Sequence, residues 1–114
     1  MALFRRNRPG TLRGADSEDL RHLEEFVRTR RGVEGYVEPR TAVTSTTVAL
    51  VAHDGEWTRR RIEDERAAAD FAKKANIPMY DVQIVGYPQR MREWTRMRKA
   101  TGQTGVPGLD GPSV

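Results

Sequence analysis

A β-hairpin is the sequence feature that most constrains the fold of this chain. Residues 44–53 are rich in β-branched side chains, which favour an extended strand. The pair Asp54-Gly55 follows, and both residues can adopt the positive φ angles of a tight two-residue turn. Residues 56–62 then return as the partner strand. The chain is therefore expected to contain an antiparallel sheet, and its helices must cover that sheet.

The register of this hairpin decides which side chains reach the core. A two-residue turn pairs Ala52 with Trp57 and Leu50 with Arg59. The core face then carries Val48, Leu50, Ala52 and Trp57. The same register places Arg59 and Arg61 on the core side, which leaves two readings open. Either the two arginines lie beyond the helical cover and extend their charges outwards, or a β-bulge moves them.

Hydrophobic periodicity and helix-ending residues predict the remaining elements. Helices are expected at 17–31, 64–75 and 88–100, and further strands at 33–40 and 80–86. Gly32 ends the first helix, Asn76 and Pro78 end the second, and Pro88 begins the third. In the last strand, Val82 and Ile84 are expected to face inwards.

These elements predict an α+β fold. We expect a single two-layer domain of order α-β-β-β-α-β-α, with a mostly antiparallel four-stranded sheet and helices on one face. A chain of 114 residues has room for one such domain. The domain is expected at 17–100, after a disordered basic arm at 1–16 and before a flexible, glycine- and proline-rich tail at 101–114.

Positive charge is concentrated at the two ends of the sequence. The formal net charge is +4, with +3 in residues 1–16, −2 in residues 17–87 and +3 in residues 88–114. Such an asymmetry is typical of contact with RNA, DNA or another polyanion, although basic ends also keep a small protein in solution.

Several kinds of chemistry find no support in the residues. Cysteine is absent, so disulfides and thiol chemistry are excluded. His22 and Glu25 lie one helical turn apart, but two ligands do not make a metal site, and His53 belongs to the hairpin turn. No phosphate-cradling glycine loop or nucleophile elbow is present. We therefore expect no catalytic residues, metal or cofactor; an enzyme with an unrecognised pocket is the third of three hypotheses.

The first hypothesis is a non-enzymatic binding module for an anionic partner such as RNA, DNA or a ribosome surface. Arginine suits this role because its planar guanidinium matches phosphate oxygens. The candidate contacts are Arg5, Arg6, Arg8, Arg59, Arg61, Arg92, Arg96 and Lys99. The alternative is a protein-interaction or homo-oligomeric subunit that uses an apolar stripe of the last helix, made of Met91, Trp94 and Met97.

Two resemblances bear on these hypotheses. The α-β-β-β-α order resembles a double-stranded-RNA-binding domain, but Glu63-Asp64-Glu65 stands where that family has lysines, so we reject this assignment. Three stretches resemble a small actinobacterial protein family without an established activity: Glu24 to Glu34, His53 to Arg60, and Gly86 to Arg92. That resemblance implies a bacterial cytoplasmic setting and no site residues. The cytoplasm is also expected because residues 1–8 do not read as a signal peptide and no apolar run could cross a bilayer.

Overall fold

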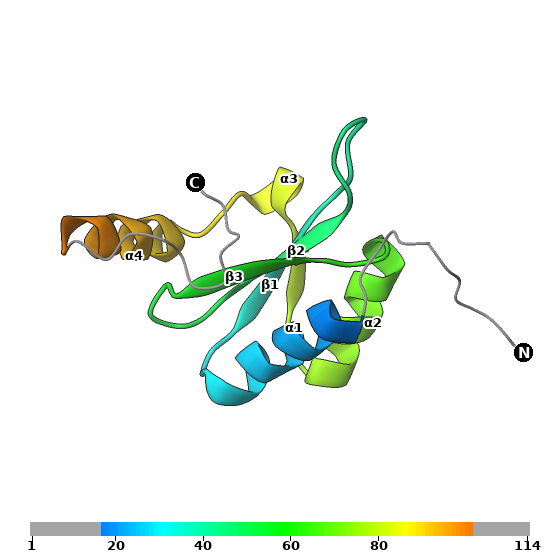
Figure 1. Cartoon of the computed structure of the whole chain (residues 1–114), viewed down its shortest axis with the longest axis horizontal. Coiled ribbons are helices and arrows are strands. Elements are labelled where there is room, and N and C mark those ends of the chain that lie inside the picture. Colours follow the sequence, from blue (N-terminus) through cyan, green and yellow to red (C-terminus); the bar gives the residue numbers. More distant parts are fainter. Residues whose placement is uncertain (1–16, 102–114) are drawn as a thin grey trace, which may run out of the picture.

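The computed structural model describes residues 17–101, and they form one four-stranded sheet with helices on both sides (Figure 1). The elements in chain order are α1 (Ser17–Thr29), β1 (Glu34–Glu38), β2 (Thr47–Val51), β3 (Trp57–Arg61), α2 (Glu65–Ala75), β4 (Met79–Asp81), α3 (Val82–Val85) and α4 (Gln89–Ala100).

The sheet has the strand order β3-β2-β1-β4. The first three strands form an antiparallel meander, in which Tyr36 lies opposite Ala49 and Ala49 lies opposite Arg59. The chain then crosses through α2, and β4 runs parallel to β1 with Tyr80 beside Tyr36. The predicted α+β class, the element order and the mostly antiparallel sheet are confirmed. The expected arm at 1–16 and all but the first residue of the expected tail lie outside the described residues.

The first face of the sheet carries the larger core, which α1 and α2 cover as expected. Both helices lie below the sheet in Figure 1. The core residues are Leu23, Phe26, Val33, Val37, Val48, Leu50, Ala52, Ile62, Ala68 and Phe71. The Asp64 side chain caps α2 by accepting from the Ala67 amide, and Asn76 ends it in the left-handed conformation with φ 61°. These caps explain why α2 lies so close to its predicted range.

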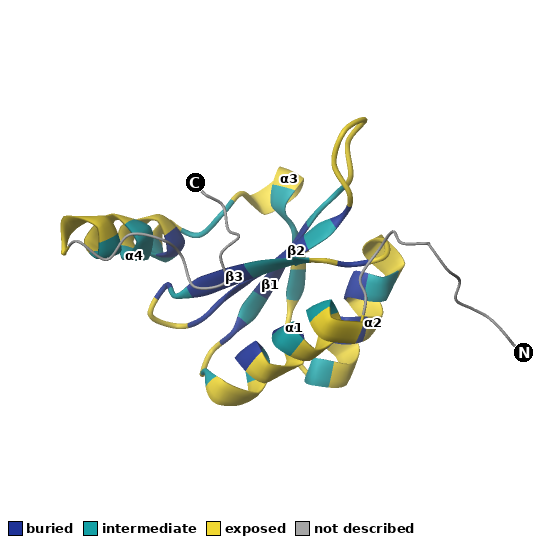
Figure 2. Ribbon diagram, viewed as in Figure 1, coloured by how far each residue is buried: buried dark blue, intermediate teal, exposed yellow. Residues whose placement is uncertain are grey.

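The second face carries a smaller core beneath α3 and α4. Tyr36, Ala49, Val51, Trp57 and Met91 are buried there, and Figure 2 shows the buried strands between the two helical layers. The prediction placed helices on one face of the sheet; this describes α1 and α2, whereas α4 packs on the other face. The smaller core is the platform on which α4 rests.

The predicted hairpin register is wrong by one residue. The turn runs from Ala52 to Glu56, because the Ala52 amide donates to the Glu56 carbonyl at 2.8 Å and the Glu56 amide donates to the Asp54 carboxylate at 3.0 Å. Trp57 therefore lies opposite Val51 rather than Ala52. Since side chains alternate along a strand, this slip moves Trp57, Arg59 and Arg61 together to the second face. The register itself thus accounts for the positions of Arg59 and Arg61, so neither of the two alternatives, extension past the helices or a β-bulge, is needed to explain them.

The predicted strand at 80–86 is also wrong beyond Asp81. The Asp81 side chain accepts from the Gln83 amide at 2.8 Å and begins the short helix α3. The helix changes the side-chain period, so Val82 packs against the second core while Ile84 is 81% exposed instead of facing inwards. The short helix α3 thus connects β4, at the edge of the sheet, to the start of α4.

Candidate polyanion-binding helix

The first two turns of α4 hold the helix on the β2–β3 hairpin. The Arg90 guanidinium donates to the Ala52 carbonyl and to the Glu34 carboxylate, both at 2.9 Å. Met91 is buried in the second core. The Trp57 indole N–H donates to the Thr95 hydroxyl at 2.9 Å. Directional polar bonds thus fix α4 in addition to apolar packing.

Gly55 allows this close approach. It has φ +97°, and a Cβ atom built on it would lie 2.1 Å from the Arg90 carbonyl oxygen and 2.9 Å from Trp94 Cβ. A carbon and an oxygen atom that are not bonded cannot approach to 2.1 Å. The Arg90 backbone cannot move aside as the end of a flexible side chain could. Gly55 therefore serves both the turn, as the sequence predicted, and the docking of α4, which the sequence did not predict.

Glu38 anchors the segment that leads into α4. Its carboxylate accepts two hydrogen bonds from Arg59, at 2.9 and 2.8 Å, one from Thr47 at 2.5 Å, and one from the Tyr87 hydroxyl. We call these four residues the Glu38 network. Burial alone would raise the pKa of Glu38, but the bonds from Arg59, Thr47 and Tyr87 outweigh burial and hold the pKa below its usual value.

Two tyrosines of this face, the buried Tyr36 and the partly buried Tyr87, resist ionisation. Burial and the hydrogen bond to Glu38 raise the pKa of Tyr87 to about 12. Burial and the hydrogen bond to Glu34 likewise raise the pKa of Tyr36 to about 12. Both phenols are therefore neutral donors at ordinary pH, and each holds a carboxylate that also receives an arginine. The arrangement is a set of structural anchors for α4.

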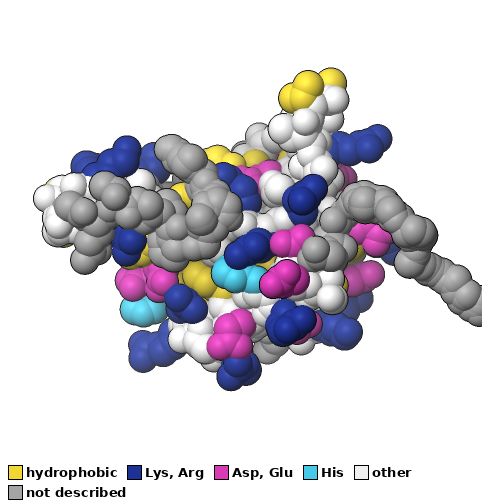
Figure 3. All heavy atoms as spheres, viewed as in Figure 1, with side chains coloured by type: hydrophobic (Ala, Val, Ile, Leu, Met, Phe, Trp, Pro, Cys, Tyr) yellow, Lys and Arg dark blue, Asp and Glu magenta, His cyan; other side chains and the backbone are white. Residues whose placement is uncertain are grey.

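Positive charge is in excess on α4 itself. The helix carries five arginine and lysine side chains and one glutamate, Glu93, which accepts from Gln89 at 2.7 Å. Arg92, Arg96 and Lys99 are exposed, and none of the three forms an ion pair with a carboxylate of residues 17–101. Their spacing places them along one flank of the helix, which we call the cationic ridge. Basic side chains are visible along α4 in the space-filling view (Figure 3).

The other arginine candidates are not on this ridge. Arg59 lies in the Glu38 network, and its guanidinium also stands 5.3 Å from the Trp57 ring centre. Arg61 is exposed at the end of β3, four residues from Trp57, which contacts α4. Arg5, Arg6 and Arg8 lie outside the described residues. The structure thus brings together Arg92, Arg96 and Lys99 on α4, whereas Arg59 is engaged by Glu38.

The apolar stripe proposed for the last helix divides into buried and exposed parts. Met91 is only 6% exposed because it belongs to the second core. Trp94 packs partly against that core, and the Arg98 guanidinium stands 4.8 Å from its ring centre. Met97 is 63% exposed. Only Met97 of the three is available as a large exposed apolar side chain.

The residues considered for metal or acid–base chemistry have other partners. His22 Nε2 lies 2.7 Å from the Thr58 hydroxyl, and Glu25 forms an ion pair with Arg28. Across residues 17–101, no group of three or more histidines and carboxylates is arranged to hold a metal ion.

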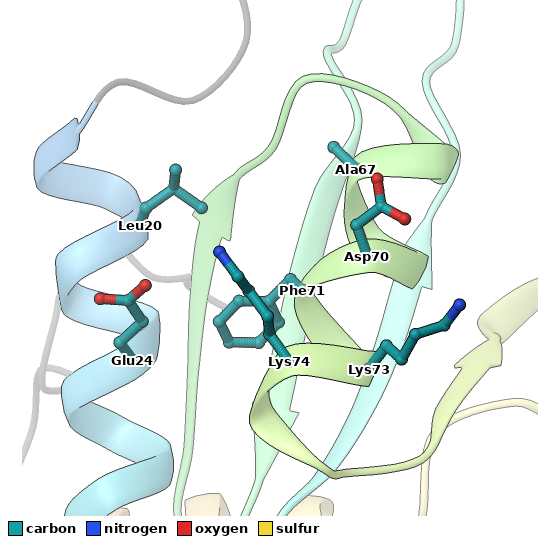
Figure 4. Close-up of a pocket in the computed structure, with 7 residues that line it drawn as sticks. All are labelled: Leu20, Glu24, Ala67, Asp70, Phe71, Lys73 and Lys74. Atoms are coloured by element: carbon teal, nitrogen blue, oxygen red, sulfur yellow. The ribbon is translucent and has the colours of Figure 1, made fainter.

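An open groove lies between α1 and α2 (Figure 4). Its volume is about 660 Å³, and Leu20, Ala67 and Phe71 form its apolar part. The charged rim consists of Glu24, Asp70, Lys73 and Lys74. Figure 4 shows the Glu24 and Lys73 side chains directed away from each other rather than towards a common point. Glu24 and Lys73 therefore do not converge on one point of the groove, whereas the Lys74 amine extends towards α1.

The important residues that sequence reasoning missed are Glu38, Tyr87 and Arg90. Glu38 carries no local signal, because its environment follows from the strand register and from α4 docking. Tyr87 and Arg90 flank the predicted helix start, but periodicity does not indicate which arginine of a basic helix becomes an anchor.

Comparisons with known proteins add no functional assignment. No protein-family model, curated protein or solved structure matches this chain. In the part of the chain that the structure describes, each helix is too short or too polar to span a membrane.

Proposed function

We propose that this protein is a non-enzymatic binding module in which α4 contacts the phosphate groups of an anionic partner, such as DNA, RNA or a ribosome surface. The single observation that carries the proposal is the cationic ridge: Arg92, Arg96 and Lys99 are exposed on a helix whose opposite side is fixed to the sheet. A fixed helix presents its charges without the entropic cost of ordering a flexible segment.

The charge balance of the rest of the molecule supports this assignment. Residues 17–88 have a net charge of −2, against +4 for α4. Several arginines of the body pair with carboxylates, as Arg30 does with Glu56 and Arg60 with Asp19. The net positive charge of α4 therefore attracts a polyanion more strongly than residues 17–88 do with their small net negative charge.

The test measures binding of the full chain to fluorescein-labelled DNA and RNA oligonucleotides by fluorescence anisotropy, at about 50 and about 200 mM salt. The variant R92Q/R96Q/K99Q removes the cationic ridge. The matched control R66Q/K73Q/K74Q removes the same charge from exposed positions of α2. Each phosphate contact contributes about 0.7–0.9 to the slope of log affinity against log salt, so the ridge variant is expected to lower the slope by about 2.

The control variant is expected to keep most of the wild-type slope. Absence of binding at the lower salt concentration would contradict the proposal. Equal affinity of the ridge variant and wild type would contradict it as well.

A second candidate function is a protein-interaction surface, and exposed apolar side chains support it. Besides Met97, the short helix α3 exposes Ile84 and Val85, the latter by 54%. If two copies associate through these side chains, light scattering will show a concentration-dependent dimer that I84S/M97S abolishes. A wild-type chain that stays monomeric at high concentration would remove the homo-oligomeric form of this candidate.

A further inference from the structure

We infer that the preferred partner of α4 is duplex DNA in the B form, with α4 lying in its major groove; this inference rests on the proposed function. Three features of the molecule favour this partner: the shape of the exposed surface of α4, the burial of the aromatic rings around it, and the fixed position of the helix.

The exposed surface of α4 is convex and covers almost half of the helix circumference. The exposed residues with large side chains are Arg92, Glu93, Arg96, Met97 and Lys99. At 100° per residue, they span an arc of about 160°, opposite to the arc of Met91, Trp94 and Thr95 that faces the hairpin. Figure 1 shows α4 extending beyond the end of the sheet, so the sheet does not shield this arc.

A convex cationic helix is complementary to a groove. An α-helix with its side chains is about 10–12 Å wide, and the B-DNA major groove is about 12 Å wide and about 8.5 Å deep. The major groove of A-form RNA is too narrow for side chains to read. Within the arc, arginine can donate to guanine and the Met97 side chain can contact a thymine methyl group. The dimensions therefore favour duplex DNA over duplex RNA.

Single-stranded nucleic acid is disfavoured by the aromatic side chains. Its recognition generally requires exposed rings on which bases stack. Here Trp57 is 4% exposed, the Trp94 ring is covered by Arg98, and the Tyr36 and Tyr80 rings stand 5.5 Å apart. Among residues 17–101, Tyr80 is the only exposed aromatic side chain, at 39%, and one ring does not provide the series of stacking surfaces that successive bases need.

The position of α4 is part of the inference, and Gly55 allows it to be tested without changing any charge. G55A forces a Cβ atom onto the Arg90 carbonyl and displaces the helix. Gly86 is the matched control, because it also has a positive φ, +74°, and its Cβ would meet nothing within 4 Å. Both substitutions strain the backbone, and only G55A obstructs α4.

The experiment compares the affinities of the wild-type protein for four probes of equal length and base sequence. They are a DNA duplex, the same duplex with glucosylated hydroxymethylcytosines that fill the major groove, an RNA duplex, and single-stranded DNA. We expect the glucosylated duplex, the RNA duplex and the single strand each to bind about tenfold more weakly than the plain duplex. Saturating the minor groove with netropsin should change the affinity little.

The outcomes separate the inference from the proposed function. Binding to no probe overturns both. Binding to the glucosylated duplex, the RNA duplex or the single strand as tightly as to the plain duplex overturns the inference and leaves the proposed function in place. G55A is expected to weaken duplex binding about tenfold, and G86A much less. Equal affinities of these two variants, with circular dichroism showing both folded, would also overturn the inference.

Discussion

The two faces of the sheet differ in the size of their apolar cores and in what their polar bonds hold. The first face buries aliphatic and aromatic side chains of α1 and α2 in one continuous core. The second face has a smaller core and depends on polar anchors: the Glu38 network, the Arg90 bonds and the Trp57–Thr95 bond. Apolar burial is non-directional and sets stability, whereas hydrogen bonds specify where a helix lies. The first face therefore contributes the larger share of apolar burial, and the polar bonds of the second face specify how α4 is presented.

The largest effect is expected from the first face. Leu50 is fully buried beneath α1 and α2, so L50A should lower the free energy of unfolding by about 2–5 kcal/mol in urea denaturation. The control V43A lies in the β1–β2 loop, where Val43 is 89% exposed, and should change stability by less than about 0.5 kcal/mol. Similar effects of the two substitutions would contradict the assignment of the core.

An intermediate effect is expected from the Glu38 network. E38Q preserves shape but removes the charge that faces Arg59, so the free energy of unfolding should fall by about 2 kcal/mol. Y87F removes one hydrogen bond of the same network and should cost about 1 kcal/mol. The reverse order of these two effects would show that Glu38 is not the centre of the network.

The difference in stability between wild type and E38Q should depend on pH. The folded state lowers the pKa of Glu38 below its ordinary value of 4.5, so its stabilisation is present above that pH. The stabilisation is lost as the pH falls through the lowered, folded-state pKa. We therefore expect the thermal midpoint of wild type to drop more steeply than that of E38Q below about pH 4.5. If the thermal midpoints of wild type and E38Q fall in parallel, Glu38 has the same pKa in the folded and unfolded states.

The smallest effect is expected from an exposed ion pair on α1. Glu25 and Arg28 have side chains that are 53% and 69% exposed. Because water and salt screen such a pair, E25Q should change the free energy of unfolding by about 0.5 kcal/mol or less, and added salt should remove the difference. If E25Q lowers the free energy of unfolding as much as E38Q does, the distinction between exposed ion pairs and the anchors of the second face is wrong.

The sequence predicts most elements of this fold because their signals are local. The β-branched run, the caps at Asp64 and Asn76, and the periodic apolar residues of α1 and α2 all act within a few positions. The hairpin register was mispredicted because the His53 amide bonds to the Arg31 carbonyl at 3.0 Å and Asp54 stabilises a longer turn. Local turn chemistry cannot reveal a bond to a residue twenty-two positions away.

The candidate site was only partly predictable for a related reason. Helical spacing alone is enough to predict that Arg92, Arg96 and Lys99 share one flank of α4. The fate of Arg59 depended on the strand register, and the burial of Met91 depended on which sheet face received the helix. The residue spacing in a helix shows which side chains of that helix are neighbours. It does not show which side chains of the sheet will contact them.

The pairing of β1 with β4 has a consequence for the order in which the chain folds. Gly35 and Met79, which lie side by side in the sheet, are forty-four positions apart in the sequence. The meander of β1, β2 and β3 needs only short loops to close, whereas β4 must wait until α2 has been synthesised and has crossed the sheet. On the ribosome, the outer edge of β1 therefore remains unpaired until residue 81 has emerged. Until then, the outer sides of both β1 and β3 are open to pairing with another strand.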